Sequence, residues 1–142
     1  MKKALLILVA LFSMWNIANA QTAEKKVKVI NMQEFMSLFD QNTGAISTPS
    51  VFDFNATWCG PCRQLAPILE ELAAEYEGRV NFYSIDVDNN KELAKMLEIR
   101  SIPYVLYFGT TGDDPEESVG LLSKEEIKVY IDKILETNQL SL

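Results

Sequence analysis

The chain has 142 residues, of which 48% are hydrophobic and 23% are charged, and this composition is typical of one globular domain and not of a disordered or collagen-like chain. With 13 Lys and Arg against 20 Asp and Glu, the formal net charge is -7, the wrong sign for a protein that neutralises phosphates, so we expect no nucleic-acid partner. There is no His and there are only 2 Cys. Because a tetrahedral zinc site needs four ligands, usually from these two residue types, we expect no metal.

The first residues have the pattern of a secretory signal peptide. Met1-Lys2-Lys3 is positively charged, residues 4–12 form an apolar run, and Ala18-Asn19-Ala20 has the small-x-small pattern that signal peptidase reads. The pattern predicts a signal peptide over residues 1–20 and a mature domain over residues 21–142. The alternative, an uncleaved membrane anchor, is disfavoured because the apolar run is much shorter than the roughly 20 residues of a membrane span.

Strand-like and helix-like segments alternate along the rest of the chain, without a repeat. In chain order we expect a strand at 27–30, a helix at 31–40, a strand at 51–56, a helix at 59–77, a strand at 80–87, a helix at 89–97, strands at 104–108 and 117–121, and a closing helix at 123–137. Ser123 and Glu126 form a capping-box pattern at the start of the last helix. This order predicts an α/β fold, a central mixed sheet of four to five strands with helices on both faces.

The motif that carries chemistry is Trp58-Cys59-Gly60-Pro61-Cys62-Arg63, at the junction of a predicted strand and a predicted helix. Two thiols at this spacing can close a small disulfide ring, and the helix N-terminus places unpaired N–H groups beside the first sulfur. We therefore expect Cys59 to be an exposed nucleophile with a lowered pKa and Cys62 to be the resolving thiol. Arg63 excludes haem attachment, which needs His there, while a structural disulfide or two inert thiols remain as alternatives.

The segment from Trp58 to Cys62 resembles the active-site motif of thioredoxins. Four further positions match that family, namely its buried aspartate at Asp53, its helix-kinking proline at Pro67, its cis-proline loop at Ile102-Pro103 and its late glycine in Val119-Gly120. The similarity covers residues 27–137 and implies the thioredoxin fold. Two positions depart from the family, because Asn55 stands where thioredoxins commonly have Trp and Ser84 where many carry a Lys facing the buried aspartate.

The resemblance implies catalytic roles for Cys59, Cys62 and Asp53. It also implies a substrate-binding surface, whose residues are Trp58, Gly60, Pro61, Ile102, Pro103 and Gly120. The bond between Ile102 and Pro103 should be cis and face Cys59, the alternative being an ordinary trans turn.

Asp53 lies between Phe52 and Phe54, where a buried strand is expected. Without a lysine beside it, desolvation should raise the pKa of Asp53, so that it can take a proton from Cys62. The alternative is a solvated carboxylate at the end of a strand.

The resemblance implies a protein-disulfide reductase that acts on partner proteins with accessible disulfides, works as a monomer and needs no cofactor. Resemblance to exported bacterial members implies a periplasmic location and a membrane-embedded thiol carrier as electron donor. Three alternatives stay open: an oxidase or isomerase of the same fold, since the reduction potential sets the direction, a reductant of apocytochrome c, and a non-catalytic peptide-binding or holdase module that adds a strand beside Pro103.

Overall fold

The computed structural model of this chain describes residues 24–140. The predicted signal peptide at 1–20 and its cleavage site therefore lie outside the described residues. None of the helices between residues 24 and 140 is long and apolar enough to cross a membrane.

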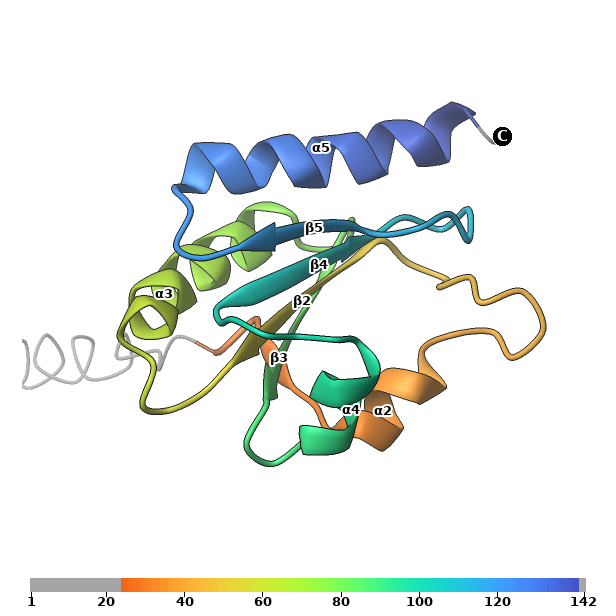
Figure 1. The fold of residues 1–142 in the computed structure, drawn as a ribbon. Coiled ribbons are helices and arrows are strands. Elements are labelled where there is room, and N and C mark those ends of the chain that lie inside the picture. Colours follow the sequence, from red (N-terminus) through yellow and green to blue (C-terminus); the bar gives the residue numbers. More distant parts are fainter. Residues whose placement is uncertain (1–23, 141–142) are drawn as a thin grey trace, which may run out of the picture.

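Five strands form one mixed sheet (Figure 1). They are β1 (Lys28–Val29), β2 (Ser50–Asn55), β3 (Asn81–Asp86), β4 (Tyr104–Phe108) and β5 (Glu116–Val119). Their order across the sheet is β1-β3-β2-β4-β5, with β1, β3 and β2 parallel and β4 antiparallel to both β2 and β5. The predicted mixed sheet is confirmed, and β2 lies at its centre.

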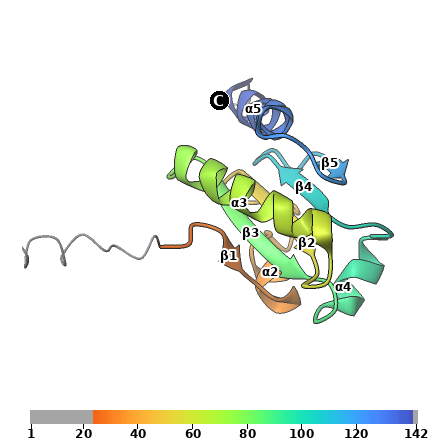
Figure 2. The ribbon, with the colours of Figure 1, turned by 90° about the vertical axis from the view of Figure 1, so that its left-hand side faces the viewer.

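Helices cover both faces of the sheet, as predicted (Figure 1). They are α2 (Met32–Ser37), α3 (Gly60–Glu75), α4 (Lys91–Met96) and α5 (Lys124–Leu140). On one face, α3 packs along β3 and α5 along β4 (Figure 2). On the other face, Phe35 of α2 and Leu93 of α4 share a core with Phe52 and Phe54 of β2.

Side chains alternate between the two faces of a strand, which places Asp53 opposite its two phenylalanine neighbours. Because Phe52 and Phe54 join the core under α2 and α4, Asp53 points toward the face covered by α3, the helix that carries Cys62. The phenylalanines that flank Asp53 in the sequence thus fix the direction of its carboxyl group.

Two helix ends differ from the prediction by more than two residues. The helix predicted to reach residue 40 ends at Ser37, because Phe39 leaves the helix to form a β-bridge with Ile46 and contacts the ring of Phe108. The last helix runs to Leu140 instead of residue 137. The hydroxyl of Thr137 donates to the carbonyl of Lys133 one turn earlier, so Thr137 is accommodated inside the helix. The other boundaries agree with the prediction to within two residues.

Candidate active site

The local sequence places the first cysteine at the N-cap of α3. Cys59 has extended backbone angles, and its sulfur accepts a hydrogen bond from the backbone N–H of Cys62 at 3.2 Å. Pro61 lies in the first helical turn, where a missing N–H breaks no helical hydrogen bond. The two cysteines form a disulfide with a Cα–Cα distance of 5.3 Å. The helix end therefore directs its partial positive charge at the sulfur of Cys59.

The expectation that Cys59 is exposed is wrong for this disulfide form. Cys59 and Cys62 are each only 4% exposed. Their side chains form a small cluster with Ala56, against which Val87 and Ile102 pack. The N-cap geometry turns the sulfur of Cys59 inward over the helix end, and neighbouring apolar side chains cover it.

Trp58, by contrast, is on the surface. Its side chain is 66% exposed, and its indole N–H donates to a carboxylate oxygen of Asp88 at 2.8 Å. This hydrogen bond fixes the ring beside the cysteine pair with its apolar faces open to solvent. The location agrees with a contact surface and not with a core side chain.

The loop between α4 and β4 brings Ile102, the residue before the predicted proline, to the cysteines. The peptide bond between Ile102 and Pro103 is cis, as predicted, and Ile102 packs against the cysteine cluster. The N–H of Gly120 donates to the carbonyl of Pro103 at 2.8 Å, so the end of β5 is tied to this loop. Gly120 has a positive φ of 90°, which favours glycine at that turn. Pro103 itself is buried, and its contact with substrate stays a prediction.

Asp53 is buried as predicted, with 3% of its surface exposed. One carboxylate oxygen, Oδ2, accepts a hydrogen bond from Nδ2 of Asn55 at 2.8 Å, while Oδ1 has no hydrogen-bond partner among the described residues. Desolvation raises the pKa of Asp53 to about 7, and the hydrogen bond from Asn55 opposes part of that rise. A carboxyl group with this pKa can both take up and release a proton near neutral pH.

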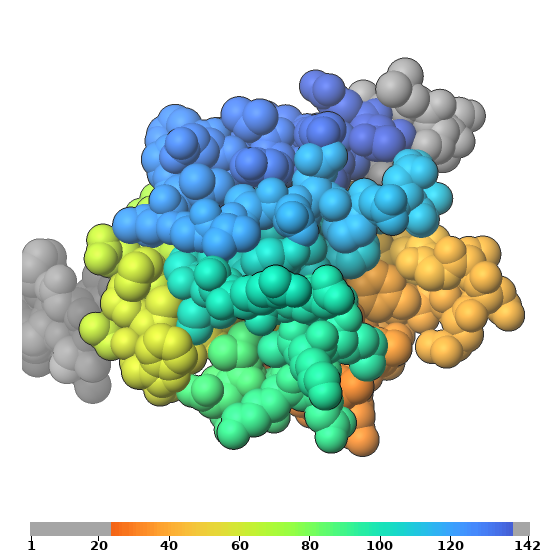
Figure 3. All heavy atoms as spheres, in the orientation of Figure 1, coloured from red at the N-terminus to blue at the C-terminus, as the bar shows by residue number. Residues whose placement is uncertain are grey.

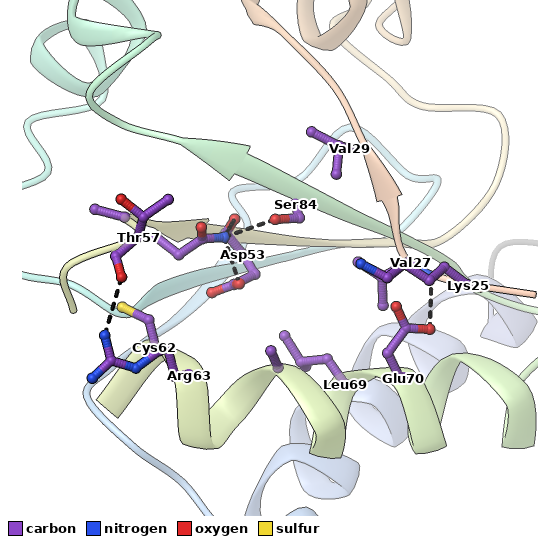
Figure 4. Close-up of a pocket in the computed structure, with 13 residues that line it drawn as sticks. Lys25, Val27, Val29, Asp53, Thr57, Cys62, Arg63, Leu69, Glu70 and Ser84 are labelled. Atoms are coloured by element: carbon purple, nitrogen blue, oxygen red, sulfur yellow. Dashed lines mark hydrogen bonds between the residues drawn. The ribbon is translucent and has the colours of Figure 1, made fainter. Parts of the chain in front are cut away.

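Asn55 and Ser84, the two positions that depart from the family pattern, are not among the predicted site residues, but the structure places both beside Asp53. Nδ2 of Asn55 contacts Oγ of Ser84 at 2.8 Å as well as the carboxylate of Asp53 (Figure 4). Asn55 follows Asp53 by two residues on β2, a spacing that places both on one face of a strand and could have suggested the contact. Ser84 lies opposite Asp53 on β3, at the position where the resemblance implies a Lys facing the aspartate in many family members.

A cavity of about 210 Å³ connects the buried carboxyl group with the second cysteine (Figure 4). Its lining includes Asp53, Asn55, Cys62 and Ser84. A space of this size can hold several water molecules, since one needs only about 10–15 Å³ of such volume. The lining is mostly apolar, and the side chains of Asp53, Asn55 and Ser84 offer polar partners within it. Water in the cavity can therefore carry a proton between the Cys62 thiol and the Asp53 carboxyl group.

Comparison with known proteins agrees with this geometry. The Thioredoxin family model matches residues 18–133. A thioredoxin of Staphylococcus saprophyticus is 42% identical over 99 residues, which cover 70% of this chain and 92% of that protein. The chloroplastic M-type thioredoxin of Pisum sativum is 35% identical over 119 residues, covering 84% of this chain and 66% of that protein.

Among solved structures, the crystal structure of a chloroplastic thioredoxin z superposes with a TM-score of 0.70 at 33% identity, covering 78% of this chain and 96% of that one. The family model spans most of the chain, and the fold and the Cys59–Cys62 pair agree with it. The chain therefore belongs to the thioredoxin family of protein-disulfide oxidoreductases.

Proposed function

We propose that this chain is an exported protein-disulfide reductase in which Cys59 attacks the substrate and Cys62 resolves the intermediate. The observation that carries the proposal is the hydrogen bond from the backbone N–H of Cys62 to the sulfur of Cys59 at the start of α3. In the reduced protein the same donor and the helix end stabilise a thiolate on Cys59. The thiolate is the form that attacks disulfides at neutral pH.

The reaction consists of two thiol–disulfide exchanges. The Cys59 thiolate attacks one sulfur of a partner disulfide, so that bond breaks, a bond between Cys59 and the partner forms, and the other partner sulfur leaves as a thiolate. The Cys62 thiolate then attacks the sulfur of Cys59 and releases the second partner sulfur. The partner gains two electrons, and this chain is left with the Cys59–Cys62 disulfide.

Asp53 acts as the general base in the second exchange. Its pKa of about 7 suits proton uptake from Cys62 near neutral pH, and the cavity that both residues line supplies space for a bridging water. Asn55 holds Oδ2 of Asp53 by a hydrogen bond, while Oδ1 is buried without a hydrogen-bond partner among the described residues.

The substrate binds on the surface around the cysteine pair. Its residues are Trp58, Gly60, Pro61, Ile102, Pro103 and Gly120. Exposed apolar side chains continue this surface on both sides of Gly120, because Val119 is 53% and Leu121 is 44% exposed. An extended substrate segment can pair with the backbone of Ile102 by strand addition beside Cys59.

Export and electron supply complete the proposal. The pattern of residues 1–20 supports secretion to the periplasm, where the mature domain over residues 21–142 works as a monomer. A membrane-embedded thiol carrier returns the electrons, because a cytosolic reductase does not reach that compartment. Mass spectrometry of the chain produced in a bacterial host tests export, with a mature protein beginning at Gln21 in the periplasmic fraction as the expected result. A full-length chain retained in the cytoplasm would contradict it.

An insulin-reduction assay tests the activity and separates it from a peptide-binding or holdase role. We expect the unaltered chain to reduce insulin with dithiothreitol as electron source, and Cys59→Ser and Cys62→Ser each to lose at least about 100-fold of that rate. If the variants suppress insulin aggregation as well as the unaltered chain does and none of the three proteins reduces insulin, the chain is a binding module.

A further inference from the structure

A second cavity lies beside the cysteine pair, on the α4 side of Trp58. It has a volume of about 450 Å³, larger than the cavity at Asp53. Its apolar lining consists of Trp58, Val87, Ala94, Ile99 and Ile102, and its charged lining consists of Lys91, Lys95 and Arg100. We call this set of eight residues, together with Ser101, the α4 groove. In Figure 3 the yellow-green segment that precedes α3 and the green segment of α4 lie on the same face of the molecule.

The three cations of the α4 groove are exposed, and within residues 24–140 none of them forms an ion pair. Other lysines of the described chain do so, for example Lys26 with Glu77 at 2.9 Å. Three uncompensated positive charges in one groove stand out in a chain with a formal net charge of -7. The groove therefore attracts negative charge, although the molecule as a whole repels it.

Within residues 24–140, no carboxylate lines the groove or forms an ion pair with its three cations. Asp88 accepts the indole N–H of Trp58 and, with Glu92, lines a neighbouring pocket that Lys91 also lines. Glu98 is exposed and does not line the groove. The lining of the groove is thus apolar and cationic, with no carboxylate in it.

We propose that the α4 groove binds the segment next to the reactive cysteine of an acidic partner protein. An apolar side chain of that segment lies against Trp58 and Ile102, and neighbouring Asp or Glu side chains pair with Lys91, Lys95 and Arg100. This inference rests on the proposed function, since Ile102 also packs against the cysteine cluster and the groove adjoins the proposed substrate surface. The groove would select among disulfide substrates by charge.

Charge selection of this kind has a recognisable signature. Exposed charge pairs act mainly on encounter with the partner and are screened by salt, so they change KM and kcat/KM much more than kcat. An acidic substrate should therefore be preferred at low ionic strength, and the preference should shrink as salt is added. A purely apolar groove would show neither effect.

Two peptide pairs test the proposal. One pair carries a disulfide with a neighbouring Leu and is flanked either by Asp or by Lys, and the other pair has Ser in place of each Cys and a fluorescent label. Reduction of the first pair gives kcat and KM, and fluorescence anisotropy of the second gives affinity without any redox step. We expect about tenfold tighter binding and about tenfold higher kcat/KM for the Asp-flanked peptides at low salt.

Charge-reversed variants supply the decisive comparison. Lys91→Glu/Lys95→Glu/Arg100→Glu should abolish or invert the preference in both readouts, and the milder Lys91→Gln/Lys95→Gln/Arg100→Gln should remove it. The matched control is Lys28→Glu, the same charge change at an exposed lysine of β1 that lines a different pocket, and it should keep the preference.

The two readouts separate failure of the groove from failure of the reductase. Equal affinity for Asp- and Lys-flanked peptides, or a preference that survives the triple variants, would overturn the acidic-partner proposal even if both disulfides are reduced. Selective binding of the acidic peptide without reduction of either disulfide would overturn the proposed function and leave the groove proposal supported.

Discussion

Asp53 is a buried carboxyl group without a cationic partner among the described residues, and its ionisation opposes folding. Burial raises its pKa from the usual 3.8 to about 7. Between those values the unfolded chain loses a proton that the folded chain keeps, so stability falls as pH rises through that window and stays low above it. Asp53→Asn should therefore raise the free energy of unfolding by up to about 4 kcal/mol at about pH 8 and have little effect at about pH 3.

Urea denaturation at both pH values measures this gain, and insulin reduction should be slower for the same variant. Asp114→Asn makes the same change at an exposed carboxylate and should alter neither property. An Asp53→Asn protein that is less stable at about pH 8, or as active as the unaltered chain, would show that the carboxyl group is not a buried base.

Asn55 acts on Asp53 through one hydrogen bond of 2.8 Å to Oδ2. Because this bond stabilises the charged carboxylate and lowers its pKa, Asn55→Ala should raise the pKa of Asp53 above about 7. A ¹³C NMR titration of the Asp53 carboxyl carbon measures the shift directly. Asn42→Ala, at an exposed asparagine in a loop, should leave the titration unchanged. A fall in the pKa after Asn55→Ala would contradict this role.

How far the sequence predicts this site depends on which contacts are local. The burial of Asp53 follows from Phe52 and Phe54 beside it, and the N-cap position of Cys59 follows from Gly60 and Pro61. The contact of Asn55 with Ser84 depends on the register of β2 and β3, and the burial of Cys59 depends on Val87 and Ile102 from distant loops. Tertiary contacts of this kind leave no mark in a local pattern.

At the scale of elements, the start of α3 places the two cysteines in different surroundings. Cys59 lies at the N-cap of α3, where its sulfur accepts a hydrogen bond from the backbone N–H of Cys62. Cys62 lies within the first turn of α3 and lines the cavity that contains Asp53. Cys62→Ser should therefore accumulate mixed disulfides with partner proteins, because the attacking thiol remains and the resolving thiol is gone. Cys59→Ser should accumulate almost none.

Non-reducing electrophoresis followed by mass spectrometry of the trapped species distinguishes the two variants. The double variant Cys59→Ser/Cys62→Ser is the background control. If Cys59→Ser accumulated the adducts and Cys62→Ser did not, the two roles would be reversed.

The elements themselves were largely predictable, and the exceptions share a physical cause. The capping box of Ser123 and Glu126 before α5 is a local pattern and lies where the sequence predicts it. The predicted helix at 31–40 includes Phe39, which instead reaches the core from a β-bridge and stacks on Phe52. Apolar periodicity reports that a side chain is buried, but it does not report which backbone conformation buries it.

For the whole molecule, the reduction potential decides whether the protein reduces or oxidises the disulfides of its partners. The same fold can reduce or oxidise partner disulfides, and a difference of about 30 mV in potential corresponds to about 1.4 kcal/mol. Gly60 and Pro61 between the cysteines resemble reductases, and the matched relatives bear the name thioredoxin. We therefore expect this protein to be a stronger reductant than the partners it meets.

The equilibrium reduction potential of the Cys59–Cys62 pair tests this claim most directly. The chain is equilibrated with glutathione buffers of known ratio, and the fraction of disulfide is read by alkylation and mass spectrometry, with Cys62→Ser as the control that cannot close the ring. We expect a potential near the thioredoxin value of about -270 mV. A value near about -120 mV, typical of a strong disulfide donor, would contradict it and make the chain an oxidase.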